Sequence, residues 1–600
     1  MAGLKKTNDY KPLRPKEIKK SETQVSQVIN VLENDYWNPF SVFLEDEEVY
    51  NLSSGKRYEG DVEKLLDIKN QGKILMDVFL EERIRSNKTP FHDPITKQKP
   101  TLFKQQQVKR KKKDQAKDVI RVNRDILGKL LHISTKLQSP IDFANVLTFP
   151  LCPVPLSLAF PDGTKRSNSK SQLIKIIVPS LLPSSGDRTC DTLIVDLIAQ
   201  YRITSKGEAK TFGDLVTRFV SSLPKGHTRV DLVAECYRNF CIKAGERIKR
   251  GASESEKILI KSINTLLPSD LNAFYSNAEN KTRLINLTFE HIKTNPKKFL
   301  DILKCDTIVM SGDEYCHKVT QENVTNVESL VSNQEEADTK VVLHALDALK
   351  KDGNVCIRSP SGDTDILVIA IALLNENSRV LVDTGNGDNR KKVWLDSITL
   401  TSRQQDALIG FHSFTGNDCV SAFFRKSKQI CWDKMREEES DWIEMFANLG
   451  ETWTLSQSQK DDFEKFVCHL YSSKKSNVNQ ARFKIFERKH LKSKQVADLS
   501  LIPPCYRTLM LHLERANYVA KIWKSTGIAM IDLPSPTQHG WTEDWDILWT
   551  DEMFPESMTD YVVSNEDDDE DDFEDDVEGD VFDESDEEDA NDSSDDEENE

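Results

Sequence analysis

The stretch SPSGDTDILVIAIALL, residues 359–374, places two acids directly before the longest apolar run of the chain. Asp363 and Asp365 are two residues apart, and Glu336 and Asp338 repeat this spacing in an earlier Glu-Ala-Asp segment. Crowded carboxylates repel each other and lose hydration when buried, so a chain that gathers them needs a compensating cation. Mg²⁺ and Mn²⁺ prefer such oxygen ligands. The pattern therefore predicts a divalent-metal cleft of the kind that assists attack on a phosphodiester.

The surrounding sequence alternates between strand-like and helix-like segments. Short apolar segments predict strands at 193–196, 229–234, 355–357, 366–374 and 379–383, and a hairpin over 307–319. Between them, helical patterns cover 211–223, 237–250, 255–300 and 335–351. This alternation predicts an α/β fold over 185–435, with a mainly parallel sheet flanked by helices. Asp196, Asp363 and Asp365 fall at or just past strand ends, where ligands bind in such sheets.

The flanking regions differ in composition from this central part. We expect disorder over 1–30 and a mostly helical region over 31–150, which carries the basic patch Lys109–Lys113 and ends at a Pro-rich stretch. A helical, Trp-rich region is expected over 436–555. The acidic segment 556–600 is too polar to bury a core and is expected to be a disordered tail.

The formal net charge of −18 hides a basic body. Residues 565–600 hold 24 Asp or Glu and no Lys or Arg, which leaves 81 basic against 75 acidic residues elsewhere, a net charge of +6. This asymmetry predicts nucleic acid as a partner. We expect DNA in preference to RNA. The tail would bind histones, cover the protein's own basic cleft, or only solubilise the chain.

Cysteine usage and hydropathy indicate where the protein acts. The eleven cysteines include no Cys-x-x-Cys pair, which is typical of a reduced intracellular protein without a zinc module. The apolar run 366–374 is too short to cross a bilayer. We expect no membrane association and a nuclear location, with the cytoplasm as the alternative.

Five motifs in order carry a resemblance to a known family. They are an Ile-Val-Asp strand ending at Asp196, an acid after the second strand, Glu336-Ala-Asp338, the SPSGDTD segment, and TGNDCVSAF at 415–423. This order resembles the flap-endonuclease/XPG branch of the PIN-like nuclease superfamily. It is similar to a divergent metazoan set, often transposon-associated, with S-P-D-T-D and T-G-C-D-T-T-S-A-F signatures. The nuclease resemblance covers 185–435.

The resemblance implies a PIN-like fold and a structure-directed, metal-dependent nucleic-acid phosphodiesterase. In that family two Mg²⁺ or Mn²⁺ ions would be held, and Lys243 and Arg250 would contact the scissile phosphate. The implied metal ligands are Asp196, Glu235, Glu336, Asp338, Asp363, Asp365 and Asp418. Two departures stand out: Glu235 replaces the usual Asp, and residues 421–428 lack the Gly-rich turn that holds DNA.

Other interpretations of the same residues stay open. Acids at strand ends can simply cap the next helix, and Lys243 and Arg250 can belong to a solvated face. The main alternative function is a catalytically inactive PIN-like module that binds nucleic acid or protein, such as a domesticated mobile-element protein. A chromatin-associated scaffold with a histone-binding tail is a further alternative.

Overall fold

The computed structural model describes residues 22–23, 25–26, 29, 67–86, 88–89, 142–177, 188–236, 258–313, 315–374, 379–387, 390–437, 441–491, 498–543 and 545–551. They belong to two compact units: residues 1–109 with 266–270, and residues 110–265 with 271–600. In the first unit, α3 (Ile68–Phe79) continues into the π-helix η1 (Leu80–Arg85), where the helical spacing over 62–84 predicts a helix.

The second unit is built on a mixed sheet. Its described strands follow the order β5-β4-β3-β2-β1-β6-β7-β8. The five strands β3, β2, β1, β6 and β7 are parallel, whereas β4, β5 and β8 pair antiparallel at the two edges. The bounds are β1 Thr192–Asp196, β2 Arg229–Val233, β3 Thr307–Ser311, β4 Cys316–Val319, β5 Val324–Asn326, β6 Val355–Ser359, β7 Val380–Thr384 and β8 Lys391–Trp394.

The predicted α/β class is confirmed, but the sheet is less regular than expected. The strands expected near 193, 229, 355 and 379 appear as β1, β2, β6 and β7, and the expected hairpin is β3–β4. The expectation of a mainly parallel sheet is not confirmed, because the hydrogen-bonded edges are antiparallel. These pairings do not test the finer PIN-like assignment.

The strand order contains a reversal that positions the site. From β1 the chain builds outward through β2 and β3, then returns to the other side of β1 with β6 and β7. The loops after β1 and β6 therefore leave the same edge of the sheet in opposite directions. In open α/β sheets this reversal opens a crevice at the carboxyl ends of the strands, where ligands bind.

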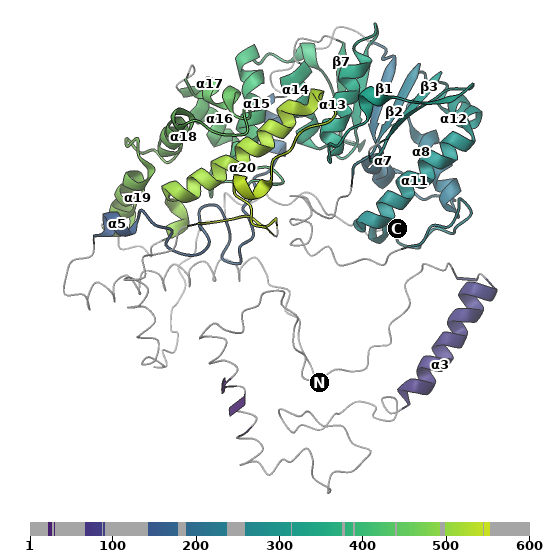
Figure 1. Cartoon of the computed structure of the whole chain (residues 1–600), viewed down its shortest axis with the longest axis horizontal. Coiled ribbons are helices and arrows are strands. Elements are labelled where there is room, and N and C mark those ends of the chain that lie inside the picture. The colour runs from purple at the N-terminus through teal and green to yellow at the C-terminus, as the bar shows by residue number, and fades with distance from the viewer. Residues whose placement is uncertain are drawn as a thin grey trace. The chain divides into compact units, whose positions relative to one another are not determined.

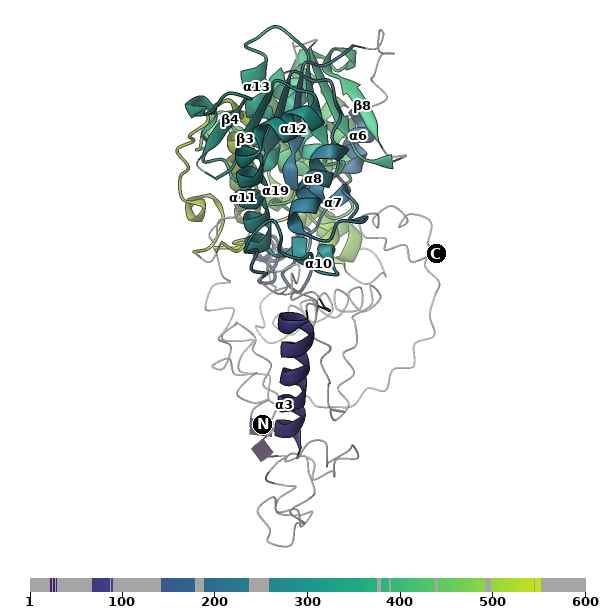
Figure 2. The same cartoon turned by 90° about the vertical axis from the view of Figure 1, so that its right-hand side faces the viewer.

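Helices cover both faces of the sheet. Figure 1 shows α13 and α14 on one side of β1–β3, and α8, α11 and α12 on the other; Figure 2 looks from that second side. Helix α13 packs on β1, β2 and β6. The bounds are α7 Leu197–Ile203, α8 Phe212–Ser222, α10 Leu271–Ser276, α11 Ala278–Thr294, α12 Pro296–Leu303, α13 Ala337–Ala348, α14 Thr364–Leu374 and α15 Ser402–Thr415.

The predicted strand over 366–374 is wrong, because these residues form helix α14. Ile366 to Ile371 are completely buried. Helices α13 and α15 pack against α14, as do α20 (Tyr506–Lys524) and α6 (Ser171–Ile177). A helix enclosed in this way is apolar all round and shows no helical period, so the sequence run could not distinguish it from a buried strand.

The C-terminal helices share the core of the sheet. One buried cluster runs from Leu147 through α14 and α15 to Trp549 and includes side chains on both sides of position 435. Figure 1 shows the long helix α20 lying along α14 and α15. The other helices of this region are α16 Lys428–Glu437, α17 Asp441–Asn448, α18 Gln457–Leu470 and α19 Val478–Phe486.

Several predictions concern residues that the structure describes only in part or not at all. The helix expected over 255–300 is right from Leu271 onward, whereas residues 258–270 form no helix. The helix over 237–250, the basic patch 109–113 and the tail 556–600 lie outside the described residues, and the predicted domain boundaries stay predictions. Among the helices that the structure describes, none has the length and apolarity to traverse a lipid bilayer.

Candidate metal centre

A cluster of carboxylates from separate elements lies beyond the carboxyl ends of the strands at the reversal. Asp338 lies in the first turn of α13, and Asp365 in the first turn of α14. Asp363 directly precedes α14, in the loop that leaves β6. Asp338, Asp363 and Asp365 each offer an oxygen within 4.8 Å of the others, and Asp338 and Asp365 are buried. These three carboxylates, the acidic triad, could hold a metal ion.

Asp196 stands at the end of β1 and has two roles. One of its oxygens accepts the backbone N–H of Ala199 (3.1 Å), so it caps α7. Burial, and then the negative charge of Glu235 with a smaller effect of Asp363, raises the pKa of Asp196 to about 7. The helix-capping interpretation is therefore right for Asp196, and the same carboxylate lies within electrostatic reach of Glu235 and Asp363.

Asp363 is similarly shared between helix and cluster. Its side chain accepts the backbone N–H of Asp365 (3.1 Å), which satisfies a donor at the start of α14. Burial and the charge of Asp365 raise the pKa of Asp363 to about 6, although Lys170 opposes the shift. Like charges forced together in a partly buried site produce this pattern.

Lys170 is the cation that faces these acids. Its ammonium lies 2.8 Å from Asp365, 3.0 Å from Asp418 and 3.5 Å from Asp363. Although burial opposes it, the three carboxylates raise the pKa of Lys170 above its usual value. An ammonium has three N–H donors and no acceptor, so three surrounding carboxylates match its capacity.

A rigid segment positions Lys170. Asn168, two residues before it, donates to the carbonyl oxygens of Thr415 (3.2 Å) and Lys426 (2.9 Å), and the amide of Ala422 donates to the carbonyl of Arg166 (2.8 Å). The residues before α6 are thus fixed against the TGNDCVSAF motif.

Asp365 has a second partner in His412. The Nε2 atom of His412 lies 2.8 Å from Asp365, and both side chains are buried. Burial, and then the charge of Lys428, lowers the pKa of His412 to about 4, so the ring is neutral at pH 7 and donates its Nε2 proton. Burial alone would raise the pKa of Asp365, but Lys170 and His412 hold it below its usual value.

The remaining predicted ligands differ in how directly they interact with the acidic triad. Asp418 forms an ion pair with Lys170, and its negative charge also helps to raise the pKa of Asp363. Glu235 follows β2, is half-buried, and acts on Asp196. Glu336 is the N-cap residue of α13, two positions before Asp338, and its role as a ligand stays a prediction.

Sequence reasoning found the acids but not their partners. The predicted phosphate-contacting residues Lys243 and Arg250 lie outside the described residues. Lys170 carries no sequence signal, because it is far in sequence from every acid of the cluster and lies outside the 185–435 segment. His412, three residues before Thr415, supports the cluster through Asp365.

The comparisons with known proteins identify no family for this chain. No family model matches the chain, and a search of the curated proteins gives no match either. The chemistry of the site therefore rests on its own residues.

Proposed function

We propose that this protein is a divalent-metal-dependent, structure-directed nucleic-acid phosphodiesterase with a PIN-like, flap-endonuclease-like fold. The observation that supports it is the convergence of carboxylates at the strand reversal. Asp196, Glu235, Asp338, Asp363, Asp365 and Asp418 come from different parts of the chain and repel each other. An arrangement this costly is expected where a site must bind cations.

The donor set suits a hard ion. Carboxylate oxygens are the ligands that Mg²⁺ and Mn²⁺ prefer, and the acidic triad consists of carboxylates alone. A divalent ion bound there would activate water and neutralise charge on a phosphate. Asp338, Asp363 and Asp365 would hold it, while His412 fixes the orientation of Asp365.

Nucleic acid is the proposed substrate because the chain without its acidic tail carries a net positive charge. The chain without residues 565–600 has a formal net charge of +6. Such a body would bind the sugar–phosphate backbone without reading bases, so its affinity should fall with added salt.

The test replaces the two acids of the SPSGDTD segment. The double variant Asp363→Asn, Asp365→Asn keeps side-chain shape and removes both charges. In Mn²⁺ it should not cleave a DNA duplex that carries a single-stranded flap, although its affinity for that DNA in EDTA should stay within about threefold of the wild type. The matched variant Asp461→Asn, Asp462→Asn on α18 should cleave normally. Mn²⁺-dependent cleavage by the Asp363/Asp365 variant would show that the assignment is wrong.

A second candidate function is a PIN-like module that binds but does not cut. Lys170 favours it, because an ammonium already neutralises part of the cluster. Calorimetric titration with Mn²⁺ separates the two: binding supports the enzyme, and absence of binding supports the module.

A further inference from the structure

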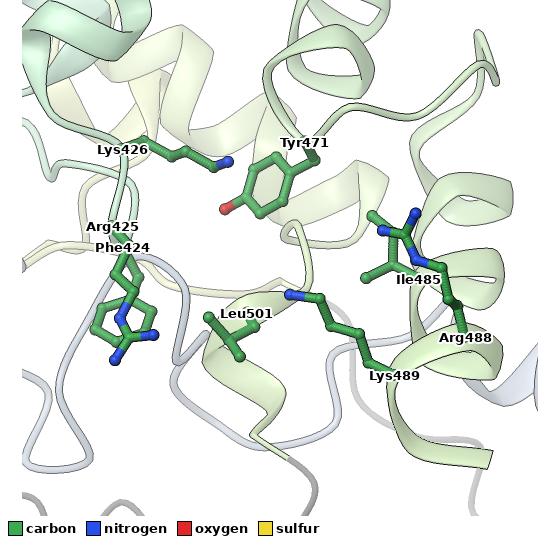
Figure 3. A pocket seen from close by; sticks show the side chains of 8 residues that line it. All are labelled: Phe424, Arg425, Lys426, Tyr471, Ile485, Arg488, Lys489 and Leu501. Carbon is green, nitrogen blue, oxygen red and sulfur yellow. The ribbon is translucent and has the colours of Figure 1, made fainter. Parts of the chain in front are cut away.

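A basic pocket lies in the C-terminal part of the second unit. Arg425, Lys426, Arg488 and Lys489 line it together with Tyr471 and apolar side chains, and its volume is about 80 Å³. Figure 3 shows the ammonium groups of Lys426 and Lys489 and the ring of Tyr471 around one space. A single water needs roughly 10–15 Å³ in this measure, so the pocket has room for a small hydrated anion.

The cations come from two separate segments. Arg425 and Lys426 follow the TGNDCVSAF motif, whereas Arg488 and Lys489 belong to the π-helical turn η6 (Glu487–Leu491) after α19. Burial, followed by the charges of Arg488 and Arg425, lowers the pKa of Lys489, and Asp498 only partly opposes this.

Lys426 is affected in the same direction. Burial lowers its pKa, with Lys489 and Lys434 contributing and the Cys431 thiol opposing. Bringing these groups together costs electrostatic energy that a bound anion would recover.

Tyr471 provides an independent indication of a ligand. Its side chain is 7% exposed, and its hydroxyl has no hydrogen-bond partner among the described residues. The ammonium of Lys426 lies 4.7 Å from the ring centre. The hydroxyl points into the pocket, toward the side where Phe424 stands (Figure 3). A buried hydroxyl without a partner is destabilising, and a phosphate oxygen could accept its proton.

The pocket is tied to the acidic cluster by a short route. Asn168 donates to the carbonyl of Lys426 (2.9 Å), and Lys170, two residues later, contacts Asp418 (3.0 Å). The segment that contains Asn168 and Lys170 therefore contacts both places.

We propose that this pocket binds a backbone phosphate of the nucleic acid, away from the phosphate at the acidic cluster. The inference rests on the proposed function for the identity of the polymer. Lys426 and Lys489 would supply charge to the phosphate, and Tyr471 would donate one hydrogen bond to it. The pocket would thus position the strand without reading its sequence.

The test measures DNA binding by the full-length protein in EDTA, where cleavage cannot occur. Lys426→Gln, Lys489→Gln should weaken binding of a fluorescent flap duplex at least tenfold and reduce the slope of log affinity against log salt by about 1–2. Tyr471→Phe, which keeps the ring, should weaken binding about threefold or more without changing the slope. Lys474→Gln, Lys475→Gln removes two charges from an exposed stretch after α18 and should change affinity less than twofold. Circular dichroism verifies folding.

Two results would overturn the proposal. In one, the pocket pair weakens DNA binding no more than the exposed pair. In the other, calorimetry shows that the pocket variants no longer bind inorganic phosphate, but their affinity for DNA is unchanged. The pocket would then be a site for small anions. The DNA-binding test contains no metal ion, so its result is independent of whether the Asp363/Asp365 variant loses Mn²⁺-dependent cleavage.

Discussion

Lys170 is the cation that contacts three carboxylates of the acidic cluster. It contacts Asp363, Asp365 and Asp418, two of which also belong to the acidic triad. An ammonium and a divalent ion therefore compete for the same oxygens. The family resemblance predicts two ions, and the three carboxylates that Lys170 contacts would be candidate ligands of a second one.

Replacing Lys170 should change how many ions bind. Lys170→Met removes the charge and keeps an unbranched chain, so the freed carboxylates should hold one Mn²⁺ more than the wild type, counted by electron paramagnetic resonance. Lys175→Met, at an exposed position on helix α6, which begins directly after Lys170, should leave the number unchanged. An unaltered number of ions in Lys170→Met would show that the ammonium does not occupy an ion site.

Metal affinity should depend on pH through two of the acids. The pKa of Asp363 is raised to about 6 and that of Asp196 to about 7, so the ion-free cluster retains protons at mildly acidic pH. Binding must displace them, so Mn²⁺ affinity should rise from pH 5 to 7.5 and then level off. Calorimetry in buffers of different ionisation enthalpy measures the protons released; equal heats in all buffers at pH 6 would contradict this.

The same shifts predict how the ion-free protein responds to pH. A carboxyl whose folded-state pKa is raised contributes stability below its unfolded-state pKa of about 4. That contribution is lost as pH rises through the folded-state values of about 6 for Asp363 and about 7 for Asp196. Added Mn²⁺ should therefore raise the melting temperature more at pH 7.5 than at pH 5.

At the residue scale, the three acids of the acidic triad were among the predicted ligands, whereas the partners Lys170 and His412 were not predicted. Asp196 ends β1 and Asp363 lies in the loop after β6, as the local pattern predicts, whereas Asp365 lies in the first turn of α14. Lys170 and His412 act through contacts between distant segments. No local rule relates a lysine before α6 to an acid nearly two hundred residues later.

At the scale of elements, α14 and α15 determine how the site is held. Helix α14 carries Asp365, and α15 carries His412 and leads to Asp418. Helix α15 in turn packs on α17 and α20. Gly410 allows this approach, because a Cβ atom there would lie 2.1 Å from the carbonyl oxygen of Phe446.

Gly410→Ala should therefore destabilise the protein. Alanine would gain about 1 kcal/mol in helix propensity, but a backbone clash at 2.1 Å forces α15 and α17 apart. We expect a net loss of about 1–3 kcal/mol in the free energy of unfolding, measured by urea denaturation. Gly527→Ala is the control, because its nearest contact is Leu346 Cδ1 at 3.4 Å. A Gly410→Ala variant as stable as the wild type would mean that the helices are not closely packed.

Element types were predictable where local signals were strong. Helix α8 begins at a Thr211 capping box, and β1 and β2 are short apolar segments, so their types and approximate bounds follow from the sequence. The types of the exposed edge strand β5 and the enclosed helix α14 could not be predicted from the sequence. Strand β5 lacks an apolar pattern, and α14 lacks a polar face. Which strands pair depends on contacts between distant segments, so the strand order was also unpredictable.

At the scale of the whole molecule, charge is divided between body and tail. Residues 565–600 account for the change from a net charge of +6 to −18. A polyanion attached to a basic body competes with nucleic acid for the same cations.

Deleting residues 565–600 should strengthen DNA binding, most of all at low salt. Fluorescence anisotropy should show at least a tenfold lower dissociation constant at about 50 mM salt and a smaller difference at higher salt. A variant that keeps the length but carries Asn and Gln for the acids should behave like the deletion. If the deletion binds DNA no better than the full chain, the tail does not compete for that surface.

The shared core also determines which pieces of this protein can be studied alone. A fragment cut at residue 435 would lose α17 and α20, and their absence would leave α15 bare along its packed side. Such a piece would be prone to aggregate, and a negative assay with it would report misfolding rather than missing chemistry. Experiments on the acidic centre should therefore retain the chain at least to Trp549, the last residue of the common core.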